Sequence, residues 1–103
     1  MTTGTKPEMK LIRQGEKLKL YRITAEAGME MPAHHSTMEV ALIVQQGEAV
    51  IKIEAEDFTV KADEQIIIPA GKIHSLSIKS DFVAIAVMGK IADIQFEKDI
   101  STL

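Results

Sequence analysis

The sequence contains no cysteine among its 103 residues. The chain therefore forms no disulfide bond and uses no thiol in catalysis. No apolar run approaches the roughly 20 residues that a membrane-spanning helix needs, and the N-terminal stretch lacks the apolar segment of a signal peptide. We therefore expect a cytoplasmic protein.

The chain also lacks a cluster of basic side chains. Its 12 Lys and Arg residues and 15 Asp and Glu residues give a formal net charge of −3, and the two signs are interspersed. Nucleic acids and anionic membranes select proteins that concentrate positive charge on one surface. We expect neither as a partner, and a chain of this size indicates one globular domain with a modest core.

Short apolar segments between glycine, proline and charged turns make up most of the chain. Leu18 and Leu20 alternate with lysines over residues 17–24, which predicts a half-buried strand. Eight or more short strands at this spacing predict an all-β sandwich or barrel. Turns are predicted at Gly47 and at residues 79–81. The other predicted strands cover residues 9–12, 38–44, 48–53, 58–60, 65–68, 74–78 and 82–88.

The two ends of the chain are less regular than its middle. Residues 1–10 are mostly polar and are expected to be a flexible N-terminal segment, whereas residues 11–103 are expected to form a single domain. From residue 90 onward the pattern fits either one helical turn, through Ile91, Ile94 and Lys98, or a last strand.

Residues 82–88 are apolar at every position, which predicts a central strand covered on both faces. The core of one barrel covers only one of these faces. The other face must be covered by the N-terminal strands or by a second subunit. Because a two-fold dimer is the commonest way to cover such a surface, we expect a homodimer.

All three histidines fall in two short segments, each after a proline. Successive side chains of a strand point to opposite faces, so His34 and Ser36 share a face and His35 points the other way. If residues 40, 42 and 44 face the interior, His34 and Ser36 do so too, provided that no bulge intervenes. Glu39 then lies outside beside His35.

The first histidine segment, residues 28–47, resembles the first motif of the cupin family, whose members are small antiparallel jelly-roll barrels. That motif has a glycine, five residues, His-x-His, three or four residues, a glutamate, six residues and a glycine. Gly28, His34 and Gly47 match it. Ser36 stands at the second histidine position, and Val40 stands at the glutamate position.

The second segment resembles the second cupin motif, which is a glycine, five residues, Pro-x-Gly, two residues, a histidine and later an asparagine. Pro69, Gly71 and His74 match its centre, whereas Asp63 and Ile78 stand at the glycine and asparagine positions. The resemblance spans roughly residues 18–88. It implies a cupin-like double-stranded β-helix, a small antiparallel jelly-roll barrel, with an incomplete set of metal ligands.

A first-row metal usually takes three or four donor atoms that converge on one point. Here the candidate metal ligands are His34 and His74, with a weak hydroxyl from Ser36. His35 would join them only if a bulge turned it inward. We therefore expect a divalent ion to bind weakly or not at all, and no other cofactor is indicated.

Three classes of function stay open. A small-molecule-binding cupin with a degenerate metal site in the barrel fits the residues best, and its ligand would contact His34, Ser36, Val40 and His74. A metal-dependent enzyme of the dioxygenase or isomerase class is what the resemblance most often implies, but it needs a third strong ligand. A structural role needs only the barrel. The sequence identifies neither a substrate nor a catalytic residue.

Overall fold

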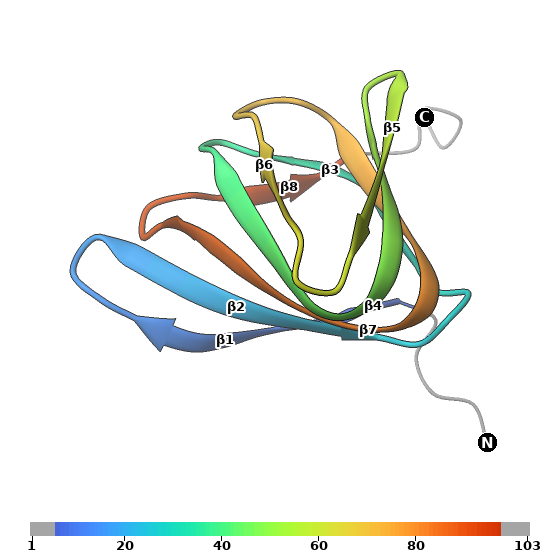
Figure 1. Ribbon diagram of the computed structural model, residues 1–103. Helices are drawn as coiled ribbons and strands as arrows, with labels where there is room; N and C mark the ends of the chain where they lie inside the picture. Colours follow the sequence, from blue (N-terminus) through green and yellow to red (C-terminus); the bar gives the residue numbers. More distant parts are fainter. Residues whose placement is uncertain (1–5, 98–103) are drawn as a thin grey trace.

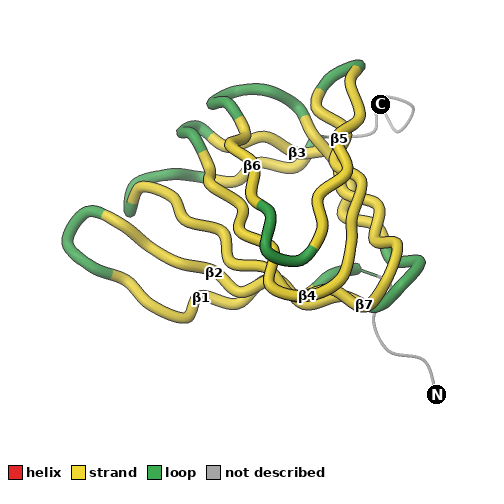
Figure 2. Tube along the Cα trace, viewed as in Figure 1, coloured by secondary structure: helices red, strands yellow, loops and turns green. Residues whose placement is uncertain are grey.

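The computed structural model describes residues 6–97 as an all-β structure (Figures 1 and 2). Residues 1–5 of the predicted flexible segment and residues 98–103 of the tail lie outside this range. The first strand begins at Glu8, inside the segment 1–10, and the tail contributes a short last strand. The strands are β1 (Glu8–Gln14), β2 (Leu18–Ala25), β3 (Glu30–Ser36), β4 (Val40–Ile53), β5 (Glu56–Lys61), β6 (Gln65–Ile68), β7 (His74–Gly89) and β8 (Ile94–Phe96).

The strands form two facing antiparallel layers that share β4 and β7. The first layer runs β1, β2, the second half of β7, the first half of β4, and β6. The second layer runs β8, β3, the first half of β7, the second half of β4, and β5. Figure 1 shows the strands curling around a common interior. The predicted jelly-roll barrel is confirmed.

Two turns predicted from the sequence are wrong, because they are bends inside continuous strands. β4 passes through Gly47 and β7 passes through residues 79–81, and the ladder between the two strands shifts register at this corner. The bends nest closely, since a Cβ atom on Gly47 would overlap the carbonyl oxygen of Asp81. Gly47 also has a φ of +84°, a backbone conformation that residues other than glycine rarely adopt. The turn signals therefore mark a corner of the barrel.

The second half of β7 alternates as a central strand should. Its even-numbered residues from Phe82 to Met88 are buried in the core, and its odd-numbered residues are half-buried on the outer side. Paired residues share a face, so Leu20, Val87, Ala41 and Ile67 form one row across the outside of the first layer. We call this surface the outer face; its apolar residues are Leu18, Leu20, Ala41, Ile43, Ile67, Val83, Ile85 and Val87, and it also carries the polar residues Arg22, Thr24 and Gln65.

The N-terminal strands do not cover the outer face. β1 pairs with β2 and β2 pairs with β7, so both extend the layer sideways. Among residues 6–97, the main contacts of β7 are with β2, β3 and β4, the strands that are hydrogen-bonded to it. Of the two coverings predicted for this face, β1 and β2 therefore do not provide one, and covering by a second subunit stays a prediction.

Candidate functional site

The fold brings His34 and His74 together inside the barrel. They are directly opposite each other on β3 and β7, and their ring centroids lie 4.2 Å apart with the planes at 63°. Both are buried, with 4% and 5% of their surface exposed. A register shift between Met31 and His34 adds one residue to β3, so both of these side chains face the interior although they are three positions apart.

Each of these two rings is held by a backbone carbonyl. The Nδ1 atom of His34 lies 2.6 Å from the carbonyl oxygen of Pro32, and the Nδ1 atom of His74 lies 3.0 Å from that of Lys72. A carbonyl only accepts, so Nδ1–H is the donor and Nε2 carries the lone pair in the neutral ring. Among residues 6–97 neither Nε2 atom has a hydrogen-bond partner, which leaves two acceptors available to a ligand.

Burial lowers the pKa of both imidazoles from the ordinary value of 6.5, and the backbone hydrogen bonds oppose this only partly. The neighbouring His34 and His35 lower the pKa of His74 further. The two rings are therefore neutral at pH values near 7.

The rings line a small cavity of about 30 Å³. Val40 and the methionines Met9, Met31 and Met88 also line it. A water molecule needs about 10–15 Å³ measured in this way, so the cavity accommodates one or two waters or an ion. Sites for drug-sized ligands usually measure about 300–1,000 Å³. The enclosed space thus fits a single polar group and not a whole organic molecule.

A family model described as a cupin domain matches residues 21–88. The chain belongs to the cupin-domain family. The comparison with curated proteins found no match.

Solved structures show the same fold at low sequence identity. A cupin superfamily protein from Desulfitobacterium hafniense is 17% identical with a TM-score of 0.75, over 86% of this chain and 82% of that one. A protein with a double-stranded β-helix domain from Klebsiella pneumoniae is 16% identical with a TM-score of 0.82, over 96% and 85%. A salicylate 1,2-dioxygenase mutant from Pseudoaminobacter salicylatoxidans is 13% identical with a TM-score of 0.70, over 79% of this chain and 25% of that one.

The remaining cupin ligand positions do not complete a site for a divalent metal. Val40 lines the cavity but offers no donor atom. Ser36 is buried, and its Oγ atom accepts a hydrogen bond of 3.2 Å from the Met38 amide. Among the residues that the structure describes, no group of three or more His, Cys, Asp or Glu side chains could hold an ion. The residues present therefore do not fit the family's usual metal.

His35 lies outside this cupin cavity. The bulge in β3 comes before His34, so it does not turn His35 inward. The Nδ1 atom of His35 lies 2.7 Å from a carboxylate oxygen of Glu97. The sequence predicted Glu39 as the neighbour of His35, but His35 contacts Glu97 of the tail instead. The alternation of side chains along a strand does not predict where the tail lies.

The last strand closes the barrel beside the histidines. Phe96 is opposite His34 in the ladder between β3 and β8, and the two rings lie 4.9 Å apart at 41°. Ile94 lines the cavity, and the Glu97 amide donates to the carbonyl of Ala33. Sequence reasoning missed these residues, because the tail carries no cupin motif and only a weak strand pattern.

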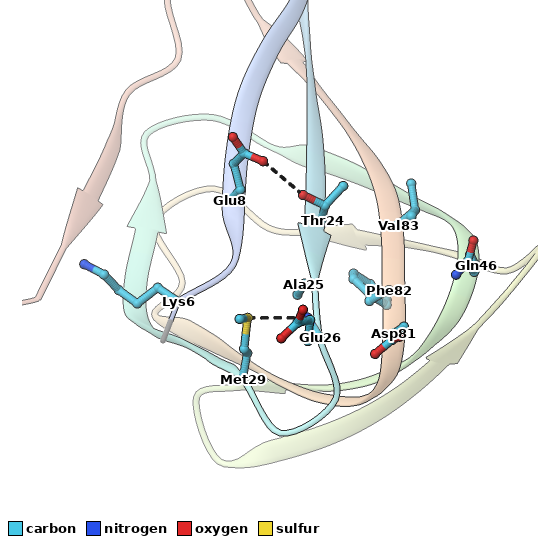
Figure 3. A pocket seen from close by; sticks show the side chains of 10 residues that line it. All are labelled: Lys6, Glu8, Thr24, Ala25, Glu26, Met29, Gln46, Asp81, Phe82 and Val83. Atoms are coloured by element: carbon cyan, nitrogen blue, oxygen red, sulfur yellow. Dashed lines mark hydrogen bonds between the residues drawn. The ribbon is translucent and has the colours of Figure 1, made fainter. Parts of the chain in front are cut away.

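Several larger openings are present elsewhere in the described part of the cupin domain. A groove of about 390 Å³ lies between β5 and β6, with walls that include Ile53, Phe58, Ile66 and Pro69. A pocket of about 570 Å³ shares no lining residue with the histidine cavity (Figure 3). Its charged side chains have both signs: Lys6, Glu8, Glu26 and Asp81.

Within residues 6–97 there is no helix that could cross a membrane.

Proposed function

We propose that this protein is a small-molecule-binding cupin whose metal site is degenerate. The observation that carries the proposal is the pair of buried, neutral imidazoles of His34 and His74, each with its Nδ1 atom engaged by the backbone and its Nε2 atom available. Two such acceptors in an apolar cavity favour a ligand group that donates hydrogen bonds, because the unprotonated nitrogen of a neutral imidazole can only accept one.

The size of the cavity limits which part of the ligand it holds. A hydroxyl or amino group fits in about 30 Å³, and Val40 would contact it from the opposite wall. The body of the ligand would occupy the groove between β5 and β6. The groove and the histidine cavity share no lining residue, but their walls are neighbours, since Ile53 of the groove is paired with His74 and Pro69 follows directly after the cavity residue Ile68. Ser36 would act indirectly, by anchoring the end of β3 through the Met38 amide.

The alternative function is that of a metal-dependent cupin enzyme, of the dioxygenase or isomerase class, with a non-standard ligand set. A lone pair on Nε2 with Nδ1–H held by a carbonyl is the arrangement in which histidine commonly binds a metal. One of the similar structures is a salicylate 1,2-dioxygenase. This alternative requires the substrate or water to supply the remaining donors.

A screen of small aliphatic and aromatic alcohols and amines by thermal shift tests the proposal. We expect some of these probes to raise the melting temperature of the wild type and of His35→Gln, which alters the histidine outside the cavity. The shift should be lost in His74→Gln. If His74→Gln keeps the same shift, the proposal is wrong. A stoichiometric divalent metal in the purified protein, measured by elemental analysis, would favour the enzyme instead.

We also propose that a second copy of the chain covers the outer face. One row of this face is apolar across β2, β7, β4 and β6, namely Leu20, Val87, Ala41 and Ile67, and the next row has Ile85 and Ile43 at its centre. An identical surface related by a two-fold axis would bury both copies at once. The cytoplasmic location and the lack of nucleic-acid or membrane partners stay predictions from composition.

A further inference from the structure

Methionine side chains line the cavity beside the two histidines. Three of the six methionines of the chain line it, namely Met9, Met31 and Met88, and Met31 and Met88 are buried, with 5% and 2% of their surface exposed. A thioether sulfur is a soft donor that selects monovalent copper over magnesium, manganese or calcium, and imidazole is also a good copper ligand. Two imidazoles and three thioether side chains, two of them buried, thus border one small space.

The position of each methionine follows from the strands. The bulge in β3 turns Met31 to the same side as His34. Met88 of β7 is directly opposite Val40 of β4, so the two side chains share a face. The family resemblance places a carboxylate ligand at Val40. The hard oxygen donor is therefore missing, and a soft sulfur donor lies beside its place.

The charge of the cavity also favours a monovalent ion. None of its lining residues is Asp or Glu, so nothing in the wall neutralises a cation. The cost of moving an ion from water into such a medium rises with the square of its charge, so a divalent ion is penalised about four times as much. A space of about 30 Å³ also has no room for the several waters that hard divalent ions retain.

We infer that this cavity binds one Cu(I) ion through the imidazoles of His34 and His74 and the thioethers of Met31 and Met88. The inference rests on the proposed function in one respect, namely that the histidine pair is the binding centre. It adds a soft metal ion to the hydroxyl and amino groups that the proposed function considers as ligands. Methionine at a buried position often only fills space, so the experiment must separate packing from coordination.

The test is an anaerobic titration of the cysteine-free protein with Cu(I) held by a coloured bicinchoninate chelator. We expect the wild type to withdraw one equivalent of Cu(I) and to gain thermal stability. Ag(I), which does not change its redox state, should give the same stoichiometry. Zn²⁺ and Ni²⁺ at equal concentration should produce a smaller shift of the melting temperature.

Conservative variants identify the donor atoms. Met31→Leu and Met88→Leu nearly conserve volume and should fold. Each should weaken Cu(I) binding by at least about tenfold, because even the loss of an outer-shell partner commonly has that effect. The matched control is Met38→Leu, since the Met38 thioether lies over Gly89 and outside the cavity. Ag(I) should also shift the methyl NMR signals of Met31 and Met88 but not that of Met38.

Unchanged Cu(I) affinity in both Met31→Leu and Met88→Leu would overturn the inference, as would a preference for Zn²⁺. If the alcohol and amine probes bind through His74 while Cu(I) does not bind, the inference fails and the proposed function stands. If His74→Gln alters the binding of neither, both fail.

Discussion

His34 and His74 are opposite residues of neighbouring antiparallel strands, and their rings meet at 63° with centroids 4.2 Å apart. Each imidazole is therefore desolvated by the barrel and lies against a second group that becomes positive at low pH. Charging both rings would place two like charges together in a poorly solvated space.

The first prediction concerns the pH dependence of stability. Burial lowers the pKa of both rings in the native state, whereas the unfolded chain keeps values near 6.5. The contribution of the two neutral rings to the free energy of unfolding is therefore fully present above about pH 7. It is lost as the pH falls through about 6.5, because the unfolded state then binds protons before the native state does. The melting temperature of the wild type should fall between about pH 7 and pH 5 more steeply than that of His74→Gln.

His34→Gln removes the other buried ring and should flatten the slope in the same way as His74→Gln. Calorimetry at a series of pH values is the measurement. Equal slopes for the wild type and His74→Gln would show that the native state does not exclude protons from the pair.

The second prediction concerns the missing metal ligands. The double variant Ser36→His with Val40→Glu restores the family's ligand types at both positions. Without metal it should be less stable than the wild type by a few kcal/mol, because a carboxylate replaces a buried valine. Manganese, nickel or zinc should restore about 2.7 kcal/mol when present at about 100 times its dissociation constant.

Melting curves with and without metal measure this effect. The wild type should shift much less than the double variant under the same conditions. An equal shift in the wild type would show that its residues already complete a divalent site, and no shift in either protein would show that the four positions do not converge.

The third prediction contrasts two motif glycines with positive φ. Gly47→Ala should be severely destabilising or prevent folding, since its Cβ would overlap the backbone of Asp81 at the corner of the barrel. Gly28 has a φ of +93° but open space around its Cβ position, so Gly28→Ala should cost only the backbone strain, about 1–2 kcal/mol. Urea denaturation measures both, and similar values would argue against the nested bends.

The fourth prediction concerns Asp63, which stands at a motif glycine position and has a φ of +71°. Asp tolerates this region better than most residues but less well than glycine. Asp63→Gly should therefore raise stability by about 0.5–1 kcal/mol. Asp57→Gly, inside β5, should instead lower stability by about 0.5–1 kcal/mol. If Asp63→Gly lowers stability instead, the Asp63 side chain stabilises the fold by more than the backbone strain at its positive φ destabilises it.

The fifth prediction concerns assembly. Light scattering at micromolar concentration should give the mass of a dimer for the wild type. Ile67→Lys should shift it toward the monomer, because this outer-face side chain is already 56% exposed in a single chain and its replacement costs the fold little. Leu11→Lys is the control, since Leu11 is opposite Tyr21 on the other side of the layer. A monomeric wild type would contradict the proposed dimer.

Much of the fold could be predicted, because short-range patterns determine it. The alternation around Leu18 and Leu20 and the apolar run at residues 82–88 correspond to β2 and the second half of β7. Glycine signals located the bends but could not distinguish a bend from a turn. That distinction depends on the contact between Gly47 and Asp81, which are far apart in the sequence.

The candidate site could be predicted only in part, for a similar reason. Proximity of His34 and His74 followed from the family motifs and not from spacing. The bulge that aligns Met31 with His34 has no local signal apart from Pro32, which cannot donate to a sheet ladder. The contacts of Phe96 with His34 and of Glu97 with His35 depend on where the tail crosses the barrel, and neither local propensity nor a motif determines that path.

The short last strand has a kinetic consequence. β8 has three residues and, among the strands of residues 6–97, pairs with β3 alone, yet Ile94 and Phe96 lie against the cavity and its histidine. Detaching such an edge strand takes far less free energy than unfolding the domain. The lifetime of a bound ligand should then follow how often β8 detaches. Substitutions that hold β8 more tightly would slow entry and exit together and leave the equilibrium affinity, which depends on the ring nitrogens, almost unchanged.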